Sequence, residues 1–494
     1  MNIIDNDLLS IQEARILIEH AKEAQSLLSS FSQEKLDEIV REIAKEIEKH
    51  SNELAFISQS ETDYGNTSDK YIKNKFVSSY VFEKIKDIKC IGIISEDTQN
   101  KTMDIGVPVG VIVALVPSTS PVSTAIYKTL IALKSGNVIV FSPHKRAKKS
   151  VGRALDIMIK KGLEFGLPQG SLSYLKTVTE AGTKEMMNHK DTSIIMNTGV
   201  LEMLSEGQKS GKPVIYGGNG CVPAFIERTA NIKDAVRDII KSKTFDNGVL
   251  SGSEQSVVVD SPVAMQVQNE MENLGAYFMT EKESMMIGNI LFDSTGNQEV
   301  ETIGKTALDL AKRAGISVPE NTKVLVSKQK YVFENNPYSK EKLCPVLAYY
   351  IEEDWMNACE KCIELLLSER NGHTLSIHSN DQEVIKQFAL KKPVGRILVN
   401  TPGAFGSMGI TTNLFPAMTL GSGSAGKGMT SDNISPMNLV YIRKVGVGVR
   451  SLEDITKDSS INKTVYKTKT INSENIDHEY GLKEILEKIL REIN

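Results

Sequence analysis

The order of apolar and polar residues predicts a chain that begins with helices and continues with alternating strands and helices. Across residues 11–89, apolar residues recur three or four positions apart between charged ones, as in Leu36, Ile39 and Ile43. This is the spacing of one helix face. Residues 107–141 then read as an apolar run, a helical stretch and a second apolar run. That order predicts a βαβ unit of a parallel sheet.

The same alternation divides most of the chain into two α/β domains. It continues to residue 217, so residues 1–230 are predicted to hold the helical segment and a Rossmann-type, nucleotide-binding domain. A helix at 235–241 and a valine strand at 257–259 open a second, catalytic α/β domain over residues 231–445. Its further strands are predicted at 324–327, 345–350, 375–379 and 396–400.

The last part of the chain differs from the rest in composition and in the spacing of its apolar residues. Residues 446–480 are polar, rich in Lys, Thr, Asp and Asn, and predict a linker. Residues 481–494 carry an apolar stripe at helical spacing, which predicts an amphipathic helix. Since so short a helix is marginal alone in water, it either docks on a partner or folds back onto its own domain.

Composition and charge narrow the range of partners. The 58 Lys and Arg residues against 62 Asp and Glu residues give a net charge of −4, so neither nucleic acid nor an anionic membrane is expected as a partner. No apolar run reaches the ~18 residues of a membrane span, and the first residues lack a signal-peptide pattern. Five cysteines form no compact disulfide framework. We therefore expect a cytoplasmic protein that acts on small metabolites.

One loop carries most of the functional information. Residues 244–256 read Thr-Phe-Asp-Asn-Gly-Val-Leu-Ser-Gly-Ser-Glu-Gln-Ser. The loop resembles the nucleophile loop of CoA-acylating aldehyde dehydrogenases, in which a cysteine occupies the position held here by Ser251. The resemblance spans about residues 10–445 and implies an aldehyde dehydrogenase-like α/β fold, usually in dimers or tetramers. Other matching motifs, in the family's order, lie at 108–121, 141–144, 197–199, 212–220, 341–345, 372–374 and 413–416.

The resemblance implies a two-step reaction. A cysteine thiolate attacks a small aldehyde, hydride passes to NAD, and the thioester is transferred to the thiol of coenzyme A, the co-substrate. Ser251 replaces that thiol, and a serine hydroxyl ionises far less readily and needs an adjacent base. Ser120 matches the asparagine whose amide helps to hold the oxyanion, and its shorter side chain predicts a weaker contact. The chain as written is therefore expected to be inactive or nearly so.

The resemblance also assigns a nicotinamide site. The residues carried over position by position are Ser142, Pro143, His144, Thr198, Gly199, Gly217, Gly218 and Glu341. Val200 stands where the family commonly has a second glycine, so we expect its branched side chain to crowd the turn facing the pyrophosphate. Ile215 stands where hydrolytic members have a glutamate that activates water. An apolar residue cannot act as a base, which favours a thiol acceptor.

Two further motifs suggest a phosphate loop and a metal site, and each lacks a residue that such a site requires. Residues 421–427 read Gly-Ser-Gly-Ser-Ala-Gly-Lys, but Gly428 follows where a phosphate loop needs Ser or Thr. Cys359 and Cys362 are spaced as a Cys-x-x-Cys without a second ligand pair, so no metal site is expected. The five cysteines are expected to be buried thiols.

The serine at 251 has two interpretations. Either a cysteine was deliberately replaced, or the chain is a naturally degenerate member, which Ser120 and Val200 favour. In the second case the alternative function is a catalytically silent structural or regulatory subunit that associates through its terminal helix. That helix resembles the encapsulation peptides that attach such dehydrogenases to bacterial microcompartment shells, so a shell protein is a further predicted partner.

Overall fold

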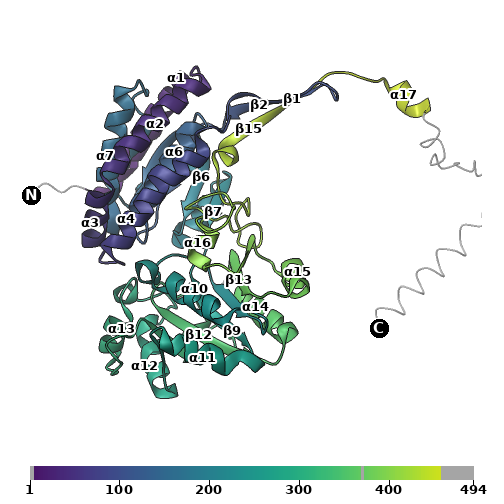
Figure 1. Ribbon diagram of the computed structural model, residues 1–494. Helices are drawn as coiled ribbons and strands as arrows, with labels where there is room; N and C mark the ends of the chain where they lie inside the picture. Colours follow the sequence, from purple (N-terminus) through teal and green to yellow (C-terminus); the bar gives the residue numbers. More distant parts are fainter. Residues whose placement is uncertain (1–4, 369–371, 458–494) are drawn as a thin grey trace, which may run out of the picture. The chain divides into compact units, whose positions relative to one another are not determined.

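The computed structural model describes residues 5–368 and 372–457 (Figure 1). The chain divides into two compact units. Within the described residues, the main unit consists of 5–95, 104–368 and 372–444, and the small unit consists of 96–103 and 445–457.

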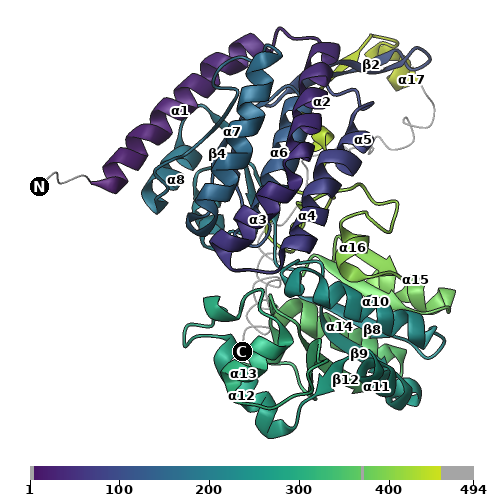
Figure 2. The same ribbon diagram turned by 60° about the vertical axis from the view of Figure 1, so that its left-hand side comes forward.

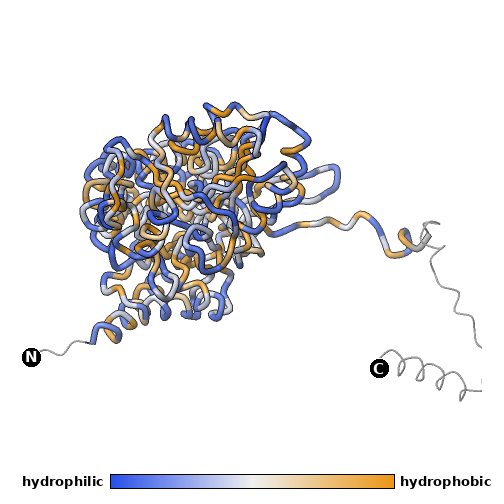
Figure 3. Tube along the Cα trace, turned by 90° about the horizontal axis from the view of Figure 1, so that it is seen from below, coloured by the Kyte–Doolittle hydropathy of each residue, from blue (hydrophilic) through white to orange (hydrophobic). Residues whose placement is uncertain are grey.

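Helices form the beginning of the main unit, as the sequence predicted. The Asp5 carboxylate caps the first helix by accepting the N–H of Asp7 and Leu8, and the Ser32 hydroxyl caps the second. The apolar stripe of α2 is buried while its charged residues face outward. In Figure 3, the helix that follows the marked N-terminus alternates between hydrophobic and hydrophilic segments. The helices are α1 (Asn6–Leu28), α2 (Gln33–Lys49), α3 (Ser51–Thr62), α4 (Thr67–Lys75) and α5 (Phe82–Ile85), with a π-helical η1 (Phe76–Val81) before α5.

A five-stranded parallel sheet follows, in the order β5-β4-β3-β6-β7. Chain order reverses between β3 and β6, as in a doubly wound Rossmann-type sheet, which confirms the predicted fold class. Helices α6 and α7 pack against each other and α2 packs against both, whereas α1 packs against α8 and the sheet (Figure 2). The elements are β3 (Val111–Leu115), α6 (Pro121–Lys134), β4 (Val138–Ser142), α7 (Lys148–Glu164), β5 (Leu172–Tyr174), α8 (Glu180–Asn188), β6 (Thr192–Thr198), α9 (Leu204–Lys209) and β7 (Val214–Gly217).

A seven-stranded parallel sheet has the order β10-β11-β12-β9-β8-β13-β14. Its strand β8 precedes residue 230 and was not predicted. The strands are β8 (Val222–Ile226), β9 (Glu254–Asp260), β10 (Ala276–Phe278), β11 (Val324–Lys328), β12 (Val346–Glu352), β13 (Thr374–His378) and β14 (Arg396–Val399). The helices are α10 (Ile232–Thr244), α11 (Ala264–Asn273), α12 (Glu281–Leu291), α13 (Ala307–Ala314), α14 (Trp355–Ser368), α15 (Gln382–Lys391) and α16 (Gly403–Ser407).

The central strands of both sheets are buried on both faces, which explains their continuous apolar sequences. In β9, Val257 and Val259 pack into one apolar cluster while Val258 packs into another on the opposite face. After β14 the chain returns to the core of the first sheet, where Phe405 and Leu420 join the apolar cluster. Residues of this returning segment therefore belong with the first core although they lie inside the predicted catalytic domain.

Three further strands form a small sheet in the order β1-β2-β15. They span Gly92–Asp97, Thr102–Pro108 and Val440–Gly446. A short helix, α17 (Leu452–Lys457), occupies the described part of the predicted linker. The predicted helix at 481–494 lies outside the described residues.

Within residues 5–368 and 372–457, no helix is both long enough and apolar enough to span a lipid bilayer.

Candidate functional site

A cavity of about 260 Å³ in the main unit brings most of the predicted site residues together. Ser251 lies at this cavity, between α10 and β9, and is half-buried. Ser142 and Pro143 are the two predicted site residues that do not line it. The predicted residues that do line it are Ser120, His144, Thr198, Gly199, Gly217, Gly218, Ser251 and Glu341.

The topology explains why residues so far apart in sequence meet here. Ser120 follows β3, Thr198 ends β6 and Gly217 ends β7, and these are neighbouring strands of one parallel sheet. Their carboxyl ends share one edge, next to the point where chain order reverses, which is where doubly wound sheets bind ligands. Ser251 and Glu341 come instead from loops that precede β9 and β12. The cavity therefore lies between the carboxyl edge of the first sheet and the amino edge of the second.

Ser251 contacts a histidine that comes from another strand. Its Oγ lies 3.2 Å from Nε2 of His373, the residue immediately before β13. The other ring nitrogen, Nδ1, lies 2.6 Å from Oγ1 of Thr374. The imidazole is fully buried and hydrogen-bonded on both sides, so its orientation is fixed.

Two glycines allow this contact. Strand β8 lies between β9 and β13 in the sheet, so the loops before all three strands converge. A Cβ on Gly220 would lie 1.4 Å from the carbonyl oxygen of Ser251, and one on Gly372 would lie 2.4 Å from the carbonyl oxygen of Gly220. Because both oxygens belong to backbone, no side-chain adjustment relieves these clashes. Glycine at both positions is therefore required for Ser251 to approach His373.

The charge around His373 favours a neutral ring. Burial, with the nearby Arg396 guanidinium as a second cause, places the pKa of His373 well below its ordinary value of 6.5. Arg396 donates from Nη1 to the His373 carbonyl oxygen at 3.0 Å and to Thr374 Oγ1 at 3.3 Å. The imidazole is therefore uncharged at neutral pH and is able to accept a proton.

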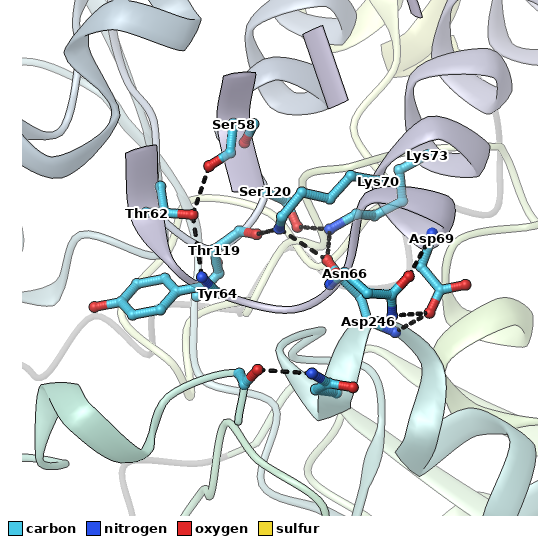
Figure 4. Close-up of polar contacts among 12 residues, drawn as sticks. Ser58, Thr62, Tyr64, Asn66, Asp69, Lys70, Lys73, Thr119, Ser120 and Asp246 are labelled. Atoms are coloured by element: carbon cyan, nitrogen blue, oxygen red, sulfur yellow. Dashed lines mark hydrogen bonds and ion pairs between the residues drawn. The ribbon is translucent and has the colours of Figure 1, made fainter. Parts of the chain in front are cut away.

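Ser120 belongs to a buried ionic cluster at another side of the cavity (Figure 4). Lys73 Nζ donates to Ser120 Oγ at 2.7 Å and pairs with the Asp246 carboxylate. Lys70 Nζ lies 3.1 Å from the same carboxylate and donates to the Thr119 carbonyl at 3.2 Å. Burial and the neighbouring Lys73 ammonium lower the pKa of Lys70 to about 8.

The cluster ties three segments of the chain together. Lys70 and Lys73 lie on α4, Ser120 immediately precedes α6, and Asp246 belongs to the loop that carries Ser251. Asp246 has φ of 47°, a left-handed conformation that a non-glycine residue seldom adopts. Its carboxylate also accepts the Asn66 N–H at 2.8 Å. These bonds hold the Ser251 loop against the helical segment.

The ammonium of Lys73 also changes the chemistry of Ser120. Because the Ser120 oxygen accepts a hydrogen bond from an ammonium, its own O–H becomes a stronger donor. Ser120 is buried at the cavity wall. It therefore has the position and the polarisation of a donor to a developing negative charge.

The residues predicted for the nicotinamide site make mostly local contacts. Ser142 Oγ lies 2.7 Å from Thr183 Oγ1, and Thr198 Oγ1 lies 2.9 Å from Thr419 Oγ1. Glu341 Oε1 accepts the Gly220 N–H at 2.8 Å, which links this residue to the Ser251 loop. Burial lowers the pKa of His144.

Val200 and Ile215 do not line the cavity. Both side chains join the apolar core of the first sheet. The Val200 N–H and carbonyl both bond the Asn197 side chain, which closes the turn. Thr198 and Gly199 line the cavity instead, and the crowding of a pyrophosphate by Val200 stays a prediction.

The five cysteines are buried, and each is a thiol rather than half of a disulfide. Burial raises the pKa of the Cys344 thiol to about 11, so it is not a replacement nucleophile at neutral pH. The glycine-rich segment at 421–427 follows an isolated bridge between Gly217 and Gly421 rather than a buried strand. It therefore lacks the strand and helix that a phosphate loop requires.

Comparison with known proteins identifies the fold family. The model of the aldehyde dehydrogenase family matches residues 4–283, more than half of the chain. The chain belongs to the aldehyde dehydrogenase family. A probable aldehyde dehydrogenase from Listeria monocytogenes is 46% identical with a TM-score of 0.90, covering 92% of this chain and 100% of that chain. An acetylating aldehyde dehydrogenase from Geobacillus thermoglucosidasius is 40% identical with a TM-score of 0.88, covering 91% and 99%.

A curated relative extends the comparison. The bifunctional aldehyde-alcohol dehydrogenase AdhE of Escherichia coli is 38% identical over 441 residues, which make up 88% of this chain and 49% of that protein. The chain thus spans about half the length of the aldehyde-alcohol dehydrogenases it matches.

Sequence reasoning missed several residues at or beside this cavity. Lys70 and Lys73 were assigned no role, because lysines three apart on a polar helix are typical of a solvent-exposed face. His373 was noted only as part of a family motif. The sequence contains no local signal for their contacts, since Lys73 lies 173 residues from Asp246 and His373 lies 122 residues from Ser251.

Replacing Asp246 tests the buried cluster. We expect Asp246→Asn to lower the free energy of unfolding by about 3–5 kcal/mol, because it leaves two buried ammonium groups without their carboxylate. Urea unfolding followed by circular dichroism measures the change. Asp234→Asn is the matched control: this carboxylate pairs with Arg237 at the surface, so the cost should stay within ~1 kcal/mol. Equal effects of the two substitutions would contradict the role given to Asp246.

Proposed function

We propose that the chain carries the framework of a CoA-acylating aldehyde dehydrogenase and forms acyl-CoA only very slowly as it stands. The observation that carries the proposal is the position of Ser251 at the cavity, in a loop whose sequence resembles the nucleophile loop of that class. The acetylating relative from Geobacillus thermoglucosidasius supports the acylating branch. Ile215, buried in the core, leaves no carboxylate at the position that activates water in hydrolytic members.

The cavity wall fits a short aldehyde. Apolar residues on one side, including Leu250, Met408 and Met418, suit a small alkyl chain, while Ser120 and Ser251 present hydroxyl groups. The carbonyl carbon of a bound aldehyde would lie near Ser251 Oγ, with its oxygen toward the Ser120 hydroxyl.

The carboxyl edge of the first sheet fits NAD. Thr198 and Gly199 face the cavity beside the point of strand reversal, and Gly199 has φ of 66°, so its backbone turns without a side chain in the way. When bound, NAD supplies the hydride acceptor that aldehyde oxidation needs. His144 and Glu341 line the same cavity and would hold the cofactor together with Thr198. Ser142 and Pro143 would support this group from beneath.

The missing sulfur is the reason for low activity. A thiolate is present at neutral pH in useful amounts, whereas a serine hydroxyl requires a base to remove its proton during attack. An oxygen ester is also a weaker acyl donor than a thioester, so transfer from Ser251 to the CoA thiol runs uphill. In the first step the proton falls to His373, whose low pKa makes it a weak base, and the second step runs uphill. The replacement therefore slows both steps of acyl-CoA formation.

Restoring the thiol tests the proposal. We expect Ser251→Cys to raise the rate of NADH formation from acetaldehyde or propionaldehyde with NAD and CoA by at least ~10²-fold, measured by absorbance at the NADH band. Ser253→Cys is the matched control, because it adds a thiol to the same loop at a buried position that does not line the cavity. This control should leave the rate of NADH formation unchanged. If Ser251→Cys stays inactive and NAD fails to bind, the silent structural subunit replaces this proposal.

The role of Ser120 is tested in the restored enzyme. We expect Ser120→Ala in the Ser251→Cys background to lower kcat by ~10²–10³-fold, since one donor to the oxyanion is lost. Steady-state kinetics with propionaldehyde measure the effect. Ser120→Asn should keep kcat within a few fold, because an amide supplies the donor that the family has there. An unchanged kcat in Ser120→Ala would remove this residue from the site.

The proposed location rests on sequence alone. Residues 481–494 resemble an encapsulation peptide, which supports placement inside a bacterial microcompartment, where a shell protein would bind the helix. We expect truncation after Lys457 to abolish co-sedimentation with purified shells while leaving the main unit folded, as judged by circular dichroism. Unchanged co-sedimentation of the truncated chain would contradict the proposal.

A further inference from the structure

Ser251 and His373 form a pair of a nucleophile and a proton acceptor at the cavity. The 3.2 Å separation between Ser251 Oγ and His373 Nε2 is hydrogen-bond distance between a nucleophile and a base. A neutral imidazole that donates its Nδ1–H to Thr374 carries a lone pair on Nε2, which faces the Ser251 hydroxyl. The Thr374 hydroxyl thus orients the ring, as a carboxylate does in a serine hydrolase triad.

The surroundings of Ser251 supply donors for an oxyanion. Within the described chain, the peptide N–H groups of Ser251 and Gly252 donate no hydrogen bond, and both residues line the cavity. The Ser120 hydroxyl, polarised by Lys73, lines the same cavity. A carbonyl oxygen that gains negative charge beside Ser251 would therefore meet unengaged N–H groups and a strong O–H donor.

We propose that Ser251 and His373 form the catalytic dyad of an acyl-thioester hydrolase that cleaves small acyl-CoA esters without any nicotinamide cofactor. This hydrolase activity goes beyond the proposed dehydrogenase function. Only the choice of CoA as the leaving thiol rests on that proposed function. The serine chemistry rests on the geometry of the dyad and cavity alone.

The reaction balances without an oxidant. Ser251 Oγ bonds to the thioester carbonyl carbon as its proton moves to His373 Nε2. The carbon–sulfur bond then breaks, and the departing sulfur takes the proton from Nε2 to leave as CoA thiol. Water attacks the resulting ester and gives its proton to Nε2. The bond between carbon and Oγ breaks, Ser251 regains the proton, and a carboxylic acid is released.

The higher free energy of a thioester relative to an ester favours acyl transfer from CoA to Ser251. In a thioester, sulfur donates its lone pair to the carbonyl less well than oxygen does in an ester. Transfer of an acyl group from CoA to Ser251 therefore runs downhill, whereas transfer from Ser251 to CoA runs uphill. The oxygen atom at position 251 thus hinders acyl-CoA formation and favours acyl-CoA cleavage.

The electrostatics of the dyad predict its pH dependence. Burial and then Arg396 keep the pKa of His373 below 6.5, so the ring stays neutral well into the acid range. A base is active in its neutral form and loses activity only as the pH falls through its folded pKa. Activity should therefore stay level from pH 8 to below pH 6.5. The same low basicity predicts slow turnover.

The test uses the full-length chain with acetyl-CoA and propionyl-CoA, without nicotinamide, and follows thiol release with a chromogenic disulfide. Hydrolysis should exceed the buffer rate in the unaltered chain and fall to that rate in Ser251→Ala. His373→Gln should lower it by on the order of 10²-fold, the usual effect of losing a general base. Ser253→Ala, a buried loop position away from the cavity, is the control and should retain full activity.

Two further measurements keep the proposal falsifiable if His373→Gln does not fold. Intact-mass analysis of the acid-quenched unaltered chain should show one acyl adduct, mapped by peptide digestion to Ser251 and absent from Ser251→Ala. The activated ester p-nitrophenyl acetate, which needs no CoA contacts, should be cleaved with the same dependence on Ser251 and the same acid limb.

The outcomes separate this proposal from the dehydrogenase function. Thiol release equal in the unaltered chain and in Ser251→Ala, with no adduct, overturns the hydrolase even if Ser251→Cys gains NADH formation. Cleavage that depends on Ser251, together with an inactive Ser251→Cys dehydrogenase, supports the hydrolase and overturns the dehydrogenase. An acid limb at or above pH 6.5 removes His373 as the base.

Discussion

The close approach of three loops at the amino edge of the seven-stranded sheet is the constraint on which the site depends. Ser251 meets His373 only because the loops before β8, β9 and β13 converge, and a side chain at Gly220 or Gly372 would collide with backbone carbonyls. The loop with Ser251 is fixed from its other end by Asp246, whose carboxylate neutralises lysines of the helical segment. Close backbone packing therefore fixes one end of the Ser251 loop, and the ion pairs of Asp246 fix the other end.

This arrangement couples the two sheets electrostatically. Asp246 and Ser251 lie five residues apart on one loop, so the ionic cluster that binds the first also sets the position of the second. Lys73 contacts both Asp246 and Ser120. A single ammonium thereby links the loop that carries the nucleophile to the turn that carries a donor for the oxyanion. The cost of burying two lysines is offset by this carboxylate and by carbonyl and hydroxyl acceptors.

Much of the fold could be predicted from the sequence, because strands buried on both faces leave long apolar runs such as residues 257–259 and 111–115. The parallel α/β class and most strands were predicted in this way. Strand β8 was missed because it is short and contains Pro223, and the return of residues near Phe405 to the first core leaves no periodic signal. The resemblance supplied most of the cavity residues, but neither periodicity nor motif spacing identifies a lysine that is buried by distant segments.

The dyad shows how much of a catalytic outcome is set by one atom. The framework fixes a nucleophile, a proton acceptor and oxyanion donors in one place, and these groups serve any attack on a carbonyl carbon. Sulfur at position 251 makes the acyl intermediate a good donor to another thiol, whereas oxygen makes it a stable ester that only water resolves. The neutral imidazole matters little to a thiolate that is already ionised and matters greatly to a hydroxyl. The same geometry therefore supports opposite directions of acyl transfer, according to whether position 251 carries sulfur or oxygen.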